Sequence, residues 1–249
     1  MSQANPLHWS SAALSHVGKV RHINEDSCLA LPEQGLWAVA DGMGGHQSGG
    51  VASRMVIETL RRITPSKEWQ SFVEQVKAGL QQVHLQLQDL SVRLYQQRTI
   101  GSTVVVVLTQ GDRGACLWVG DSRVYRLREG GLTQLTHDHS YVQELLDKGL
   151  LKPQDAQLHP QGNLITRALG QREDLLIDGV DFSIQAGDIL LLCSDGLYKM
   201  LDEMEIAILL SCGECQATVQ SLLDLALRRG AHDNVTAVVV AITATTVSA

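Results

Sequence analysis

The residues best suited to chemistry in this sequence are aspartates beside apolar runs. Asp41 and Asp195 come just after runs that predict strands, and Asp233 comes just before another. Carboxylates held where buried strands emerge suit hard divalent cations, because such ions need rigid oxygen ligands and access to water. Asp-Gly is also a strong turn signal, so each aspartate taken alone has a structural explanation.

The stretch after Asp41 favours a ligand site over a simple turn. Gly42, Gly44 and Gly45 are more glycines than a tight turn needs, and they would let backbone carbonyls approach a ligand closely. A phosphate-binding glycine loop is the other interpretation. Gln47 breaks the dinucleotide fingerprint and no Gly-Lys-Ser/Thr follows, so the pattern fits neither nucleotide motif.

Upstream, Arg21 lies close in sequence to two carboxylates, Glu25 and Asp26, just before a predicted strand. The planar, permanently charged guanidinium is well suited to phosphate recognition. The alternative is an exposed ion pair within a loop, which contributes little to stability. The residue types alone leave both interpretations open.

Short runs rich in Val, Ile and Leu, bounded by Gly, Asp or Asn, must position these groups. Strands are predicted over residues 27–31, 36–40, 103–109, 115–120, 124–128, 177–184, 189–193 and 235–242. The short link at 121–123 predicts that strands 115–120 and 124–128 pair as an antiparallel hairpin, and Gly130-Gly131 predicts a turn into residues 133–135. Apolar periodicity predicts helices over 51–63, 72–94, 203–210 and 217–229. Helix pairs between groups of antiparallel strands favour an α+β fold with helices on the outer faces of packed sheets.

Composition narrows the possible partners. The chain has 20 Lys and Arg against 27 Asp and Glu, a formal net charge of −7, and only 4% aromatic residues, which argues against nucleic acid. No apolar run is long enough to span a membrane, and residues 1–10 lack a secretory signal, so a cytoplasmic protein is expected. Without repeats or linkers, residues 1–249 are expected to form a single domain.

The cysteines are expected to be reduced thiols, because they are odd in number and several lie inside apolar runs. Cys212 and Cys215 have the spacing of a redox or zinc pair. No second cysteine pair or nearby histidine completes a zinc site, and no thioredoxin-like unit flanks them. The pair is therefore expected to have no functional role.

Taken together and in this order, these segments resemble the metal-dependent type 2C (PPM) protein Ser/Thr phosphatases, specifically their short bacterial members. The resemblance covers nearly the whole chain. It rests on eight ordered motifs, beginning at residues 21, 40, 101, 119, 135, 163, 194 and 233: RxxNED, ADGMGGH, GST, VGDSRVY, LTxDHS, NxITRALG, SDGL and DNVT. It implies an αββα four-layer sandwich of two antiparallel sheets flanked by helix pairs. It also implies a flap over about 137–169, beside a site for two Mn²⁺ or Mg²⁺ ions.

The resemblance assigns metal-binding roles to residues of this sequence. Asp41 matches the carboxylate that bridges both ions, and the Gly42 carbonyl matches a ligand of one of them. Asp195 and Asp233 match ligands of the other ion. Asp121 is similar to the aspartate that binds a third, weaker metal in bacterial relatives.

Other positions match groups that act on the phosphate or on bound water. Arg21 matches the phosphate-binding arginine. Glu25 and Asp26 match an acidic pair that either binds metal or holds metal-bound waters. Animal members of the family carry a histidine directly after the Asp-Gly pair, where this chain has Met43. The proton donor to the leaving group is therefore open between His46 and a metal-bound water.

The resemblance implies hydrolysis of phosphoserine and phosphothreonine in proteins. A water bridging two divalent metals would attack directly, and the enzyme, expected to be a monomer, would oppose a bacterial Ser/Thr kinase. Two alternatives are a catalytically silent phosphatase-like module and another two-metal hydrolase, such as a phosphodiesterase. Retention of Arg21, Asp41, Asp195 and Asp233 argues against the silent module, and the negative charge argues against nucleic-acid substrates.

Overall fold

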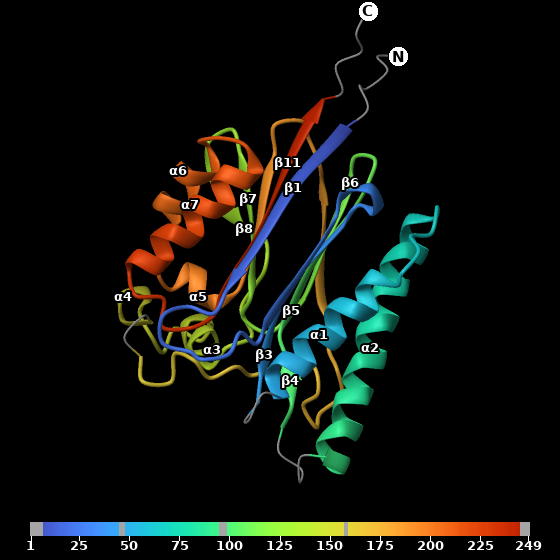
Figure 1. Ribbon diagram of the computed structural model, residues 1–249, viewed down its shortest axis with the longest axis vertical. Helices are drawn as coiled ribbons and strands as arrows, with labels where there is room; N and C mark the ends of the chain where they lie inside the picture. Colours follow the sequence, from blue (N-terminus) through green and yellow to red (C-terminus); the bar gives the residue numbers. More distant parts are fainter. Residues whose placement is uncertain (1–6, 45–47, 95–98, 157–158, 245–249) are drawn as a thin grey trace, which may run out of the picture.

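Two antiparallel sheets lie face to face in the computed structural model, which describes residues 7–44, 48–94, 99–156 and 159–244 (Figure 1). The strand order of the first sheet is β1 (Leu7–His16), β11 (Val235–Ala244), β10 (Ile189–Cys193), β7 (Arg123–Arg128) and β8 (Gly131–Gln134). That of the second is β2 (Asp26–Leu31), β3 (Leu36–Met43), β5 (Val104–Gln110), β6 (Arg113–Val119) and β9 (Asp178–Ser183). The short strand β4 (Gly101–Ser102) pairs with the end of β3.

Helices cover both outer faces, so the predicted four-layer sandwich is confirmed (Figure 1). Helices α1 (Ser48–Arg61) and α2 (Trp69–Leu94) pack on the second sheet. Helices α5 (Asp195–Tyr198), α6 (Glu203–Leu210) and α7 (Cys215–Arg228) pack on the first. Three short elements lie in connections: the 3-10 helix η1 (Pro32–Gln34), α3 (Tyr141–Asp147) and α4 (Pro153–Ala156). No helix in the described ranges is long and apolar enough to cross a membrane.

The layering explains why the strands read as continuous apolar runs. In β5, Val105 and Val107 face the other sheet, whereas Val104 and Val106 face α1 and α2. Successive side chains of a strand point to opposite faces, so a strand covered on both sides needs apolar residues at every position. The same alternation places Leu190 between the sheets and its neighbour under the C-terminal helices.

The structure corrects the predicted hairpin at residues 121–123. Strands β6 and β7 do not pair; β6 lies between β5 and β9 in one sheet, and β7 lies between β8 and β10 in the other. The link therefore carries the chain from one sheet to the other. Gly120 begins it with φ of +107°, and a Cβ there would lie 2.6 Å from the Cβ of Thr103. The hairpin predicted at Gly130-Gly131 is confirmed, with Arg128 opposite Gly131.

Strand β1 was not predicted, because Leu7–His16 is rich in serine and alanine. It pairs with β11 over its whole length, from Leu7 opposite Ala244 to His16 opposite Val235. Its backbone hydrogen bonds with β11 therefore make it a strand where its own residues favour none strongly.

Candidate functional site

The predicted site residues come from strand ends that meet at one end of the sandwich. Strands β3 and β10 end there, and β2 and β11 begin there (Figure 1). In the antiparallel register of β2 and β3, Asp26 lies directly opposite Asp41. Side chains of opposed residues share one face of the sheet at roughly 5 Å, so like charges there repel. The strand register alone brings two of the predicted carboxylates together.

Asp26 links the two sheets. Its Oδ2 accepts hydrogen bonds from the hydroxyls of Ser194, at 2.8 Å, and Thr236, at 2.7 Å. The side chain is buried, and Oδ1 has no hydrogen-bond partner. Burial, with a smaller contribution from the charges of Asp195 and Asp233, raises the pKa of Asp26 from 3.8 to about 7, against the effect of the two hydroxyls.

The backbone of Asp41 is held by the segment that leads into β5. Its N–H donates to Thr103 Oγ1 at 3.1 Å, and its carbonyl accepts from the Thr103 N–H at 2.8 Å and the Ser102 hydroxyl at 3.0 Å. Desolvation raises the pKa of the Asp41 carboxyl well above its usual range, and four nearby aspartates raise it further. These five residues, called the carboxylate cluster below, are Asp26, Asp41, Asp121, Asp195 and Asp233.

Gly42 leaves no space for a side chain. Its N–H donates to the Glu25 carbonyl at 3.1 Å. A Cβ at Gly42 would lie 2.0 Å from the carbonyl oxygen of Gly49 and 2.6 Å from that of Glu25. Glycine therefore allows the end of β3 to lie directly against the first turn of α1.

Asp121 lies in the link between the sheets and is only 2% exposed. The hydroxyl of Ser122, the next residue, is hydrogen bonded to Thr103 Oγ1 at 2.8 Å. Thr103 thus holds both Asp41 and the link that carries Asp121. Burial, followed by the charge of Asp195, raises the pKa of Asp121 from 3.8 to about 7, and its Oδ1 has no partner.

Basic side chains pair with the other two aspartates. Lys199 Nζ donates to Asp195 Oδ2 at 2.6 Å. Arg21 Nη2 donates to Asp233 Oδ2 at 2.8 Å, with 57% and 40% of the two side chains exposed. This hydrogen bond is the largest of the effects that raise the pKa of Arg21. The carboxylate that pairs with Arg21 is therefore distant in sequence and belongs to the predicted metal ligands.

Asn234 holds the loop that carries Arg21. Its amide nitrogen donates to the carbonyls of Val17, at 2.9 Å, and Ile23, at 3.0 Å. Its Oδ1 accepts from the Glu25 N–H at 2.8 Å. Glu25 in turn accepts from the N–H of Gly50, at 3.4 Å, through Oε1, so its carboxylate lies at the start of α1.

The oxygen donors of the cluster fit hard divalent cations. Asp26, Asp121 and Asp195 each keep one buried carboxylate oxygen without a hydrogen-bond partner. Burying such an oxygen costs free energy unless a cation binds it or an ordered water donates a hydrogen bond to it. Within the described ranges, no group of three or more His, Cys, Asp or Glu side chains has the spacing needed to hold one metal ion. Mg²⁺ needs only one or two carboxylates because it keeps several waters, so the cluster can serve such ions without that arrangement.

The structure gathers most of the predicted site residues and adds others. His46 lies outside the described residues. Thr103, Ser194 and Asn234 were not assigned roles from the sequence, although each lies inside one of the quoted motifs. Lys199 lies outside every motif; it caps the C-terminus of α5, and its position four residues after Asp195 was the available signal.

The structure places Cys212 and Cys215, which have the spacing of a redox or zinc pair, in different environments. Both are free thiols; Cys212 is exposed, whereas Cys215 is buried. The Cys215 thiol donates to the carbonyl of Ser10 at 3.4 Å, which joins α7 to β1. Cys215 therefore has a packing role.

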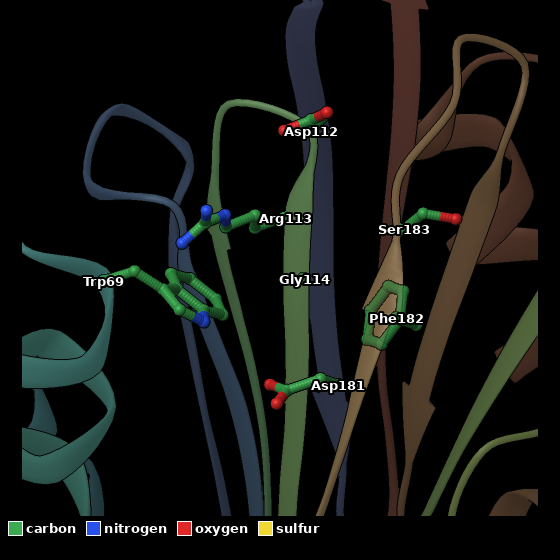
Figure 2. A pocket seen from close by; sticks show the side chains of 7 residues that line it. All are labelled: Trp69, Asp112, Arg113, Gly114, Asp181, Phe182 and Ser183. Atoms are coloured by element: carbon green, nitrogen blue, oxygen red, sulfur yellow. The ribbon is translucent and has the colours of Figure 1, made fainter.

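A separate cavity of about 560 Å³ lies at the opposite end of the sandwich, between the start of α2 and strands β6 and β9 (Figure 2). Trp69 and Phe182 form its aromatic walls, and Arg113 and Asp181 provide charge at its rim. None of the predicted site residues lines it. The carboxylate cluster is therefore distinct from this cavity.

Known proteins share both the sequence and the fold. Residues 15–228 match the family described as protein phosphatase 2C. The chain is 38% identical to the serine/threonine protein phosphatase PstP of Mycobacterium tuberculosis over 92% of its length, and it spans 44% of that longer protein. It is 34% identical to the serine/threonine phosphatase Stp of Listeria monocytogenes, covering 90% of this chain and 92% of that one.

Solved structures of bacterial proteins have the same fold as this chain. PppA, described as a key regulatory component of the T6SS in Pseudomonas aeruginosa, is 44% identical, with a TM-score of 0.88 over 94% of this chain and 98% of PppA. The catalytic domain of PstP in complex with two manganese ions is 37% identical, with a TM-score of 0.84 over 95% and 99%. Match length, identity and fold lead to one conclusion: this chain belongs to the protein phosphatase 2C family.

Proposed function

We propose that this protein hydrolyses phosphoserine and phosphothreonine in proteins with the help of two divalent cations, Mn²⁺ or Mg²⁺. The observation that carries the proposal is the carboxylate cluster with its unpartnered buried oxygens, next to the exposed guanidinium of Arg21. The two manganese ions of the PstP catalytic domain, a protein of the same family, support it.

Five residues provide the proposed metal ligands. Asp41 would bridge the two ions, the Gly42 carbonyl would bind one, and Asp195 and Asp233 would bind the other. Asp121 would hold a third, weaker ion. When bound, the ions would lower the pKa of a bridging water and neutralise the oxygens of the phosphoryl group.

The remaining residues would bind the phosphate, orient metal-bound water and protonate the leaving group. Arg21 would leave Asp233 to hold the phosphate, since a guanidinium can pair with two phosphate oxygens at once. Asp26, fixed by two hydroxyls, would bind metal directly or orient metal-bound water, and Glu25 would act with it. His46 is one candidate for protonating the leaving serine or threonine oxygen, and a metal-bound water is the other.

We further propose phosphorylated proteins as substrates and a bacterial Ser/Thr kinase as the opposing enzyme. The names of the phosphatases PstP and Stp support this substrate class. Because such a kinase needs ATP, the cytoplasm is the proposed site of action. A monomer with a single domain, including a flap over about 137–169, is the expected unit.

A comparison of substrates tests the proposal. Phosphate release from a phosphothreonine peptide is measured with Mn²⁺, with Mn²⁺ plus excess EDTA, and for the variant Asp195→Asn. We expect release only in the first case, and much slower cleavage of bis(p-nitrophenyl) phosphate. Full turnover after exhaustive chelation would refute the metal requirement. Faster cleavage of the bis-ester would favour a phosphodiesterase, and no release at all would favour a silent module.

A further inference from the structure

Lys199 lies between the carboxylate cluster and the flap segment, defined here as residues 137–169. Its ammonium donates to Asp195 Oδ2 at 2.6 Å and to Asn163 Oδ1 at 2.7 Å. An ammonium group has three N–H donors, so both hydrogen bonds can form at once. With 30% of the Lys199 side chain exposed, the contact is partly shielded from solvent.

The lysine occupies one oxygen of Asp195 and leaves the other available. Asp195 Oδ1 is buried and has no partner, whereas Oδ2 is bonded to Lys199. Groups that hold the second atom of a metal ligand orient the first, and their loss commonly weakens metal binding. Lys199 holds Asp195 in this way, because it is bonded to Oδ2 and leaves Oδ1 free to bind an ion.

The flap segment is anchored at both ends by backbone bonds. Ser140 pairs with Ile165 within it, and Leu169 pairs with Ser102 of β4. The N–H of His139 donates to the Gly120 carbonyl at 2.9 Å. Residues 142–156 and 159–164 lie between these anchors. Among these described residues, one side-chain hydrogen bond reaches the protein outside the flap segment, and it is the bond from Lys199 Nζ to Asn163 Oδ1.

We propose that Lys199 is a positioning residue that couples the order of the flap segment to the metal ligand Asp195. An ion held by Asp195 restricts the rotation of that carboxylate, and Oδ2 then keeps Lys199 in the position from which it reaches Asn163. Metal occupancy thus orders residues 159–164 of the flap segment. This inference rests on the proposed metal-binding role of Asp195.

Thermodynamic linkage makes the proposal quantitative. If Mn²⁺ orders the flap segment through Lys199, the intact contact must strengthen Mn²⁺ binding by the same factor. Because Asn163 is exposed, the expected factor is small, about 3-fold to 10-fold. A purely structural contact would stabilise the flap segment equally with and without metal.

Hydrogen–deuterium exchange of residues 159–166 measures the order of the flap segment with and without Mn²⁺. In the wild type, Mn²⁺ is expected to slow this exchange. In Asn163→Ala and in Lys199→Met, exchange should be faster without metal, and the slowing by Mn²⁺ should be lost. The double variant should behave like either single variant, because both remove one shared contact. Lys152→Met, which changes an exposed lysine of the same segment, is the matched control and should behave as the wild type.

Titration calorimetry supplies the reciprocal measurement. Asn163→Ala should weaken Mn²⁺ binding by the factor found in exchange, since it removes the flap contact without changing a charge. Unchanged exchange in Asn163→Ala, additive effects in the double variant, or undiminished slowing by Mn²⁺ would each overturn the proposal. Neither measurement uses turnover. If the wild type binds no Mn²⁺, both the proposed function and the coupling fail; if it binds Mn²⁺ without phosphatase activity, only the proposed function fails.

Discussion

Replacing Asp121 by asparagine should stabilise the metal-free protein against unfolding. In the presence of Mn²⁺, the same substitution should lower the phosphatase activity. Asp121 is 2% exposed, and its Oδ1 is buried without a hydrogen-bond partner. Burial and Asp195 raise its pKa from 3.8 to about 7, so at pH 8 it is ionised at a cost. Each pKa unit between the folded and unfolded states corresponds to about 1.4 kcal/mol, so that cost is roughly 4 kcal/mol. The asparagine amide lacks the charge but must still be hydrogen bonded, which leaves an expected gain of about 2 kcal/mol.

The sign of the pH dependence follows from the raised pKa. Below about pH 3, the carboxyl is protonated in both the folded and unfolded states and costs nothing by ionisation. As the pH rises towards 7, the unfolded state releases its proton first, and the folded state loses stability relative to it. At pH 5.5 the cost of ionisation is about half as large, roughly 2 kcal/mol, and the amide cost offsets it. The advantage of Asp121→Asn should therefore be largest at pH 8 and close to zero at pH 5.5.

Urea unfolding in EDTA, followed by tryptophan fluorescence at pH 8 and pH 5.5, measures this advantage. Asp112→Asn, which changes an exposed carboxyl, is the matched control and should have little effect at either pH. With Mn²⁺, Asp121→Asn should lower kcat on phosphopeptides and spare binding of the first two ions. An Asp121→Asn protein that is less stable than wild type at pH 8 would refute the reasoning, because Asp121 would then be a turn residue that caps its own backbone.

Three further substitutions test other parts of the site. Asp195→Asn should lower kcat by several powers of ten and leave the circular dichroism spectrum unchanged. If the variant kept the wild-type kcat, Asp195 would no longer be a proposed metal ligand. Arg21→Ala should raise KM for a phosphopeptide more than it lowers kcat, because the role proposed for this arginine is to bind the phosphate; unchanged KM and unchanged inhibition by phosphate would leave only the ion pair with Asp233. Gly42→Ala should destabilise the protein by more than about 3 kcal/mol, since its Cβ would lie 2.0 Å from the Gly49 carbonyl oxygen; a soluble variant with an unchanged urea midpoint would contradict the packing argument.

Local residue patterns were enough to predict most of the sandwich. Runs such as 104–108 are apolar at every position because both faces of the strand are buried, and this property is visible without knowing the partners. The periodicity of α2 and α7 likewise depends only on the face that each helix buries. Asp41, Asp195 and Asp233 could be predicted as site residues because each lies beside such a run.

Only the tertiary structure decided which elements pair and which charges meet. The residues 121–123 look like a hairpin link, but burial of both sheets places β6 and β7 in different layers. Strand β1 depends on β11, and Arg21 pairs with Asp233 rather than with its neighbours in sequence. Lys199 lies outside the recognised motifs, and its bond to Asn163 depends on how the flap segment folds back. Hydrogen bonds and charge interactions act through space over a few ångströms, whereas sequence patterns report only on neighbours along the chain.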